Sequence, residues 1–179
     1  SSYMFSLQVT PPYSLIDKNT DYSELPVSEM YKWIEYHKWK FKGANFINLY
    51  DKLVLHAKAE FGYLGYYNKD IGPSPFETFQ LGGDGLSGYN LYGTETIGLR
   101  GYGNGSNSQG SLTPDNGGYA YDKFTMELRY PLSLNPSSTI YVMGFLEGGN
   151  AWDDLNKINP FNIKKAAGVG FRIFLPMIG

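Results

Sequence analysis

The segment from Phe76 to Tyr130 contains FETFQLGG at residues 76–83, LRGY at residues 99–102 and KFTMELRY at residues 123–130. The first two motifs lie in an insertion rich in glycine and tyrosine, whereas the third alternates apolar and polar residues as a β-strand does. Arg100 stands near the middle of the insertion, with glycines close on both sides. We interpret this as a long loop that folds back into a β-barrel and places Arg100 inside it.

Alternation of apolar and polar residues recurs through the rest of the chain. It is clearest from Leu53 to Tyr63, where the odd-numbered residues are apolar and His56, Lys58 and Glu60 lie on the other face. A period of two residues is the pattern of a strand with one apolar and one polar face. It predicts six antiparallel strands, at residues 3–9, 38–43, 53–63, 124–130, 140–152 and 167–175.

The segments between these strands carry turn and breaker residues. Residues 14–36 are predicted to form a loop, in which Ser28 to Tyr36 is a candidate short helix. A bulge or a strand end is expected at Ala44 to Phe46, where the alternation blurs. Pro131 is expected to close its strand because proline cannot donate a ladder hydrogen bond, and a turn is expected at Asn135 to Ser138.

The connections differ in length, which bears on the fold class. They are short at residues 48–52 and 133–139, and long at residues 12–36, 70–122 and 153–164. Outer-membrane barrels show this asymmetry, although the alternation itself also fits a soluble sandwich. Tyrosine and tryptophan near strand ends, with charged residues in mid-strand on the polar faces, favour the barrel. The predicted fold class is therefore all-β, an antiparallel transmembrane β-barrel.

An open sheet of six strands would leave backbone groups unpaired in lipid. The sequence thus predicts that residues 1–179 are part of one C-terminal barrel domain, with a long inserted loop at about 71–122 and further strands outside the chain. Net charge −2 and a pI near 5.7 argue against nucleic acid as a partner. The absence of cysteine excludes disulfides and thiolate sites.

Arg100 is the candidate functional residue of the insertion. A guanidinium group suits bidentate pairing with carboxylates, and the alternation places Glu127 and Glu147 on the lumen-facing side of their strands. We therefore expect Arg100 to pair with Glu127 and Glu147 on the barrel wall. The pattern alone also fits an arginine in an exposed, flexible loop.

Other polar residues are weaker candidates for a site. His56 and Glu60 share one strand face and could form a metal or acid–base pair, or simply line a polar lumen. His37 has no matching ligand set, and Asp153-Asp154 fits a solvated loop. The Gly101–Gly110 tract lacks the Gly-Lys-Ser/Thr ending of a phosphate loop. No catalytic residue, metal site or cofactor is predicted.

Several motifs resemble, in order and spacing, those of the outer-membrane protein assembly factor (BamA/TamA) superfamily, and specifically its BamA branch. They are FQLGG at residues 79–83, LRGY at residues 99–102, and the segments 124–132, 145–152 and 167–176. The resemblance implies a barrel of about sixteen strands preceded by periplasmic POTRA modules. By this mapping the chain holds about strands nine to fourteen, and the POTRA modules, the first strand and the closing strands are not in it.

The resemblance also assigns roles to residues. Leu99, Arg100, Gly101 and Tyr102 match the family's loop-anchor motif, which is carried on the sixth extracellular loop. Glu127 and Glu147 match the acidic anchor partners on the following strands, although the second is more usually aspartate. A second LSGY at residues 86–89 and the stretch 103–118 elaborate the family's loop.

The function that the resemblance implies is not enzymatic. It is that of the central barrel subunit of the outer-membrane protein assembly machinery, which folds and inserts β-barrel proteins into the bacterial outer membrane. The implied partners are unfolded outer-membrane protein clients, accessory lipoprotein subunits and the lipid bilayer. The alternatives are polypeptide export, as in a sister branch of two-partner secretion type, a passive porin, and an outer-membrane hydrolase that uses His56.

Overall fold

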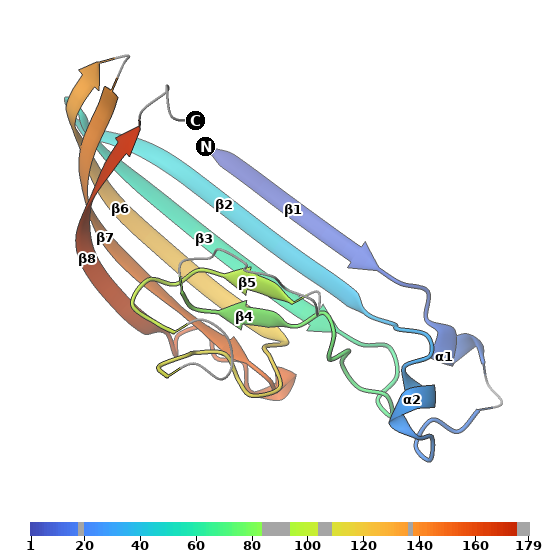
Figure 1. The fold of residues 1–179 in the computed structure, drawn as a ribbon. Coiled ribbons are helices and arrows are strands. Elements are labelled where there is room, and N and C mark those ends of the chain that lie inside the picture. Colours follow the sequence, from blue (N-terminus) through green and yellow to red (C-terminus); the bar gives the residue numbers. More distant parts are fainter. Residues whose placement is uncertain (18–19, 84–93, 104–108, 136–137, 175–179) are drawn as a thin grey trace.

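The computed structural model describes residues 1–17, 20–83, 94–103, 109–135 and 138–174. Six long strands form one antiparallel sheet in the order β1-β2-β3-β6-β7-β8, with β1 and β8 at its open edges (Figure 1). Their bounds are β1 Ser2–Val9, β2 His37–Tyr50, β3 Leu53–Gly65, β6 Ala120–Asn135, β7 Ser138–Trp152 and β8 Lys164–Phe174. The fold is all-β, as the alternation predicted.

The two faces of the sheet differ in chemistry because successive side chains point to opposite sides of a strand. Phe61 of β3 lies 6.5 Å from the ring of Phe41 and 5.4 Å from the ring of Phe124, on the convex face. Apolar side chains of this face are solvent-exposed; Phe171, for example, is 70% exposed. The concave face carries the lysine, arginine and glutamate side chains of β2, β3, β6 and β7 that line the cavity and contact the inserted loop. An exposed apolar face opposite a polar one is what a lipid-facing barrel wall requires.

The connections fall into two groups by length. β2 joins β3, and β6 joins β7, across only two residues, at 51–52 and 136–137. The long connections all lie at the other end of the strands (Figure 1). The longest, residues 66–119 between β3 and β6, is called the inserted loop below, and it carries the short strands β4 (Phe79–Leu81) and β5 (Glu95–Ile97).

The inserted loop lies against the concave face of the sheet, where β4 and β5 pair in parallel (Figure 1). Its end is tied to the wall, since Leu64 of β3 donates to the carbonyl of Tyr119 and the N–H of Tyr119 donates to the carbonyl of Trp152 on β7. Within the loop, Phe79 exchanges hydrogen bonds with Gly118. A hydrophobic cluster fills the space between loop and wall. Its buried members are Leu64, Phe79, Leu81, Ile97, Leu99, Tyr121 and Ala151. The core of this chain is therefore formed largely by the loop on the inner wall.

Two strand predictions were wrong. Pro131 does not end its strand: β6 continues to Asn135, and the register shifts between Pro131 and Ser133. This irregularity absorbs the missing N–H of proline. β2 also runs without a break through residues 44–46 and shifts register only between Asn48 and Tyr50. The alternation blurs there because Phe46 faces inward and stacks on His56 at 4.5 Å, although the backbone ladder is regular.

Short helices account for the remaining differences in the connections. α2 spans Val27–Met30, so the helix expected in residues 28–36 covers only the start of that range. α1 (Tyr13–Ile16) and a 3₁₀ helix, η1 (Leu155–Lys157), lie in segments for which the sequence predicts no helix. Each is about one turn long, too short for a helical period to show in the sequence. Residues 136–137 of the expected turn and the second LSGY motif lie outside the described residues.

Candidate functional site

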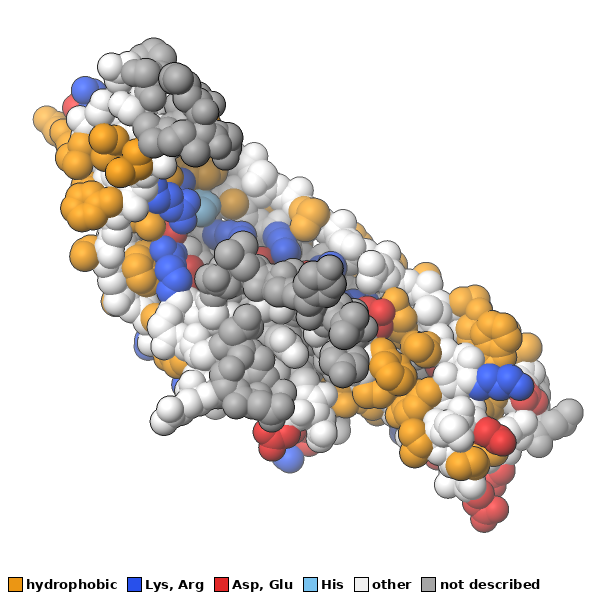
Figure 2. Space-filling view, viewed as in Figure 1, with side chains coloured by type: hydrophobic (Ala, Val, Ile, Leu, Met, Phe, Trp, Pro, Cys, Tyr) orange, Lys and Arg blue, Asp and Glu red, His pale blue; other side chains and the backbone are white. Residues whose placement is uncertain are grey.

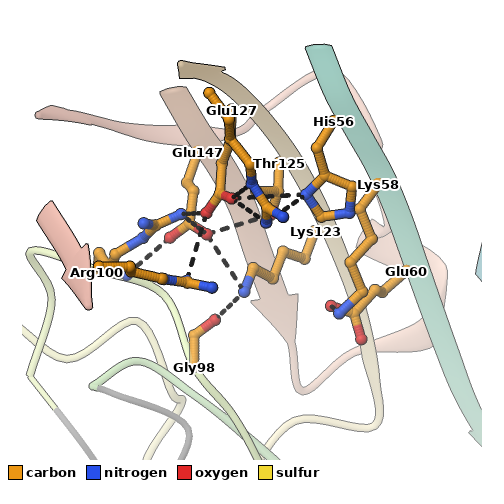
Figure 3. A network of polar contacts seen from close by, with 11 residues as sticks. His56, Lys58, Glu60, Gly98, Arg100, Lys123, Thr125, Glu127 and Glu147 are labelled. Atoms are coloured by element: carbon orange, nitrogen blue, oxygen red, sulfur yellow. Dashed lines mark hydrogen bonds and ion pairs between the residues drawn. The ribbon is translucent and has the colours of Figure 1, made fainter. Parts of the chain in front are cut away.

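Arg100 lies where the inserted loop meets the inner faces of β6 and β7 (Figure 3). Its Nη2 donates to Glu127 Oε1 at 2.6 Å and to Glu147 Oε1 at 2.8 Å, and its backbone N–H donates to Glu147 Oε2 at 3.0 Å. The guanidinium carbon lies 3.7 Å from the centroid of the Phe145 ring. The structure thus brings together the three residues that were expected to pair, and adds an aromatic platform beneath the cation.

The strand register explains this geometry. Glu127 is directly opposite Phe145, and Thr125 is directly opposite Glu147, so the two carboxylates lie on one face in adjacent rows. On β8, Gly168 is opposite Phe145. A Cβ at that position would lie 2.7 Å from the Phe145 ring, so glycine leaves the space that the ring occupies.

The other residues of the LRGY motif also have defined places. Leu99 is fully buried in the cluster between loop and wall. Gly101 has φ +88°, a conformation that favours glycine, and lets the chain turn directly after Arg100. The Tyr102 hydroxyl donates to the backbone carbonyl of Lys165 on β8 at 2.8 Å. The motif is therefore a turn that buries one side chain and directs the next toward the carboxylates.

Both carboxylates have further partners. Glu127 accepts from Arg129 Nε at 2.9 Å and lies 3.5 Å from His56 Nδ1. Glu147 accepts from Thr125 Oγ1 at 3.2 Å and lies 3.6 Å from Lys123 Nζ, which also donates to the carbonyl of Gly98 in the loop. The side chains of Glu127 and Glu147 are only 3% and 4% exposed. Breaking such buried pairs is costly because it leaves charges without partners.

The electrostatics of the site keep Arg100 charged. Burial lowers the pKa of the guanidinium, but hydrogen bonds to Glu147 and Glu127 and their negative charges outweigh it, so the pKa of Arg100 is raised from its ordinary value. Arginine is protonated at physiological pH in any case, and the carboxylates strengthen that preference. The contact is therefore a charge-assisted one at physiological pH.

A cavity of about 430 Å³ adjoins the site on the concave face. The charged residues that line it are Lys42, Lys58, Arg100, Lys123, Arg129, Arg172, Glu60, Glu127 and Glu147. Figure 2 shows lysine and arginine side chains gathered in the hollow of this face. Cations outnumber carboxylates here, which gives this part of the wall a positive, water-compatible lining.

His56 and Glu60 engage different partners. His56 Nδ1 faces Arg129 Nη2 at 3.1 Å and Glu127, whereas Glu60 pairs with Lys58 and Lys42. Within the described ranges, no three His, Cys, Asp or Glu side chains are grouped as metal ligands. The contacts fit the interpretation of His56 and Glu60 as part of a polar wall.

The other two candidates lie away from the site. His37 is on the convex face, where its Nδ1 accepts from Trp39 Nε1 at 2.8 Å and its ring stacks on Tyr63. Asp154 begins η1, accepts from the N–H of Asn156 and lies 3.1 Å from Lys157 Nζ. The hydrogen bond from Asn156 lowers the pKa of Asp154, which is otherwise a solvated loop residue.

Sequence reasoning missed several members of the network around Arg100. Lys123, Thr125 and Arg129 were detectable, because they occupy alternate positions on the same strand face as Glu127. Phe145 and Gly168 were not, because their meeting depends on a register between strands that no local pattern specifies.

Comparison with known proteins gives the family. The Omp85 superfamily domain matches residues 18–179. A search of the curated proteins found no match. In the part of the chain that the structure describes, no helix is both long and apolar enough to cross a membrane. The chain belongs to the Omp85 superfamily, whose members are outer-membrane β-barrel proteins of outer-membrane protein biogenesis or secretion.

Proposed function

We propose that this chain is part of the central barrel of a machine that folds and inserts β-barrel proteins into the bacterial outer membrane, as in the BamA branch of the superfamily. Its substrates are unfolded outer-membrane protein clients, and its partners are accessory lipoprotein subunits and the bilayer. The observation that carries the proposal is the LRGY turn, whose Arg100 is paired with Glu127 and Glu147 on the inner wall.

The mechanism involves no chemical catalysis. An unfolded client presents strand edges whose backbone N–H and C=O groups are unpaired, and these groups cannot enter lipid unsatisfied. A barrel that opens at a seam offers a complementary edge, so that the client pairs strand by strand as it enters the membrane. The part of the wall described here would supply rigidity during that opening.

The inserted loop is suited to this role. It fills the concave face with a packed cluster and places a charged pair where β6 and β7 adjoin. A loop fixed in this way resists changes in the curvature of the wall, because bending would separate Arg100 from one of its two carboxylates. We therefore propose that Arg100, Glu127 and Glu147 act as a loop anchor that preserves the shape of the barrel.

The experiment uses the full-length protein reconstituted in liposomes. A urea-unfolded client barrel is added, and its conversion to a heat-modifiable, protease-resistant form is followed. We expect faster conversion than in empty liposomes, and loss of much of this acceleration with Arg100→Ala. Lys157→Ala is the control, because Lys157 is 80% exposed and pairs with Asp154 of its own loop.

Other outcomes would refute the proposal. Transport of an unfolded partner polypeptide into the liposomes, without client folding, would assign the protein to export. A large, steady ion conductance without either activity would assign it to a passive porin. Client folding at the wild-type rate with Arg100→Ala would remove the anchor from the mechanism.

A further inference from the structure

A second group of charged contacts joins the inserted loop to β2. Lys40 Nζ lies 2.9 Å from Glu95 Oε2, and Lys38 Nζ lies 3.4 Å from Glu77 Oε2 and 3.8 Å from Glu95 Oε2. Glu95 is the first residue of β5, and Glu77 precedes β4 by two residues. Two cations of the wall thus contact the loop at the start of β5 and just before β4.

Lys38 is the unusual member of this group, since its side chain is only 3% exposed. Its Nζ lies 4.6 Å from the centroid of the Phe79 ring, which is fully buried and packs on Tyr121 at 4.8 Å. A buried lysine needs compensating charge, and here the loop supplies it through Glu77, Glu95 and the ring face. Withdrawal of the loop would leave these wall cations without these partners.

This group is separate from the Arg100 site. Strand β3 lies between β2 and β6, so the contacts to Lys38 and Lys40 fall on a different part of the wall from Glu127 and Glu147. The two groups of contacts share no residue. On the loop side, Glu77 and Glu95 form the contacts to β2, and Arg100 forms the contacts to β6 and β7. The charged contacts of the inserted loop therefore extend across the wall from β2 to β7.

We infer that, beside its apolar packing, the inserted loop is held on the barrel wall by two separate charged attachments, and that Lys38 and Lys40 are positioning residues that form the second. While one attachment is intact, the other remains at a high effective concentration and re-forms readily. Loss of Arg100 alone therefore frees only the nearby part of the loop. Release of the whole loop requires that both charged attachments break and that the apolar cluster between loop and wall comes apart.

This inference depends on the fold alone and not on the proposed function, so its test measures the position of the loop without a client. These 179 residues contain no cysteine, and any cysteine elsewhere in the full-length protein is replaced by serine, so that single introduced cysteines serve as reporters. Thr78→Cys reports on the β2 attachment and Leu99→Cys on the Arg100 attachment, because the two residues are 2% and 0% exposed. Each is introduced into the full-length protein in liposomes, and its rate of modification by a maleimide is measured.

We expect Lys38→Met with Lys40→Met to raise the modification rate at position 78 roughly tenfold or more, since hydrogen bonds to charged groups contribute that much to a local opening equilibrium. Position 99 should stay within about twofold of its original rate. Arg100→Ala should give the reverse pattern. The three substitutions together should expose both positions, by more than the separate effects multiplied.

Two controls make the result specific. Lys42→Met is matched, because Lys42 lies on the same face of β2 but pairs with Glu60 of β3 at 3.4 Å; it should change neither rate. A cycle of Lys40→Met and Glu95→Gln tests the pair directly. If the two residues act together, the double variant exposes position 78 little more than the stronger single one.

Methionine keeps the apolar stem of lysine, and heat-modifiable mobility of each variant verifies that the barrel has formed. Two results would overturn the inference. In one, Arg100→Ala alone exposes position 78 as fully as the triple variant does, so that a single attachment holds the loop. In the other, the lysine variant leaves position 78 as protected as before, so that β2 does not hold the loop at all.

Discussion

Replacing Arg100 with alanine removes the contacts that join the inserted loop to β6 and β7. Two hydrogen bonds to carboxylates are lost, at 2.6 and 2.8 Å, together with the cation over the Phe145 ring. A hydrogen bond to a charged group contributes about 1.5–3 kcal/mol, and breaking a buried ion pair costs about 3–5 kcal/mol.

The upper figures do not apply in full here. The Arg100 side chain is 28% exposed, and Glu127 and Glu147 keep Arg129 and Lys123 as partners in the variant. We therefore expect Arg100→Ala to lower the free energy of unfolding by about 2–3 kcal/mol. Arg100→Lys should lower it by roughly half as much, because an ammonium retains the charge but not the planar guanidinium that lies over Phe145 while its Nη2 reaches both carboxylates.

The assay is urea unfolding of the full-length barrel in lipid vesicles, followed by tryptophan fluorescence and by heat-modifiable mobility. Arg172→Ala is the comparison, because Arg172 is 50% exposed and its Nη2 lies 3.8 Å from Glu127 Oε1. This substitution should lower the free energy of unfolding by less than about 1 kcal/mol. A loss below about 0.5 kcal/mol for Arg100→Ala would refute the reasoning, since it would mean that the pair contributes no more than a surface contact.

Three further substitutions test other parts of the account by the same unfolding assay. Glu127→Gln should lower the free energy of unfolding by about 3–5 kcal/mol, because it leaves Arg100 and Arg129 without a shared carboxylate. A decrease no larger than that of Arg172→Ala would contradict the network. Gly101→Ala should cost about 1–2 kcal/mol, since φ is +88° there; an unchanged stability would contradict the turn geometry. Phe171→Arg should cost about 2–4 kcal/mol if the convex face meets lipid, and an equal stability in membranes would contradict that orientation.

Much of the fold could be predicted because the two sides of a barrel wall impose opposite chemistry on alternate residues. From Leu53 to Tyr63 the alternation identified β3 to within two residues of its end. The prediction was wrong where a single residue suggested a larger change in the backbone than the structure contains. Pro131 suggested a strand end, but one irregularity in the ladder accommodates it.

The candidate site was predictable in part. Alternation alone placed Glu127 and Glu147 on the inner face, and the LRGY motif suggested their partner. Phe145 and Gly168 could not be predicted, because they meet beneath Arg100 only through the pairing of β6, β7 and β8. The contact of Lys40 with Glu95 was equally hidden, since it joins residues 55 positions apart through the path of a long loop.

The central claim is that an inserted loop held on the inner wall allows the barrel to fold its clients. The most direct measurement compares loop protection with client folding in one set of full-length variants: Arg100→Ala, Lys38→Met with Lys40→Met, and all three together. The account predicts that the client-folding rate falls in step with maleimide protection of the loop and is lowest when both attachments are removed. A loop that is fully released while clients still fold at the wild-type rate would contradict it.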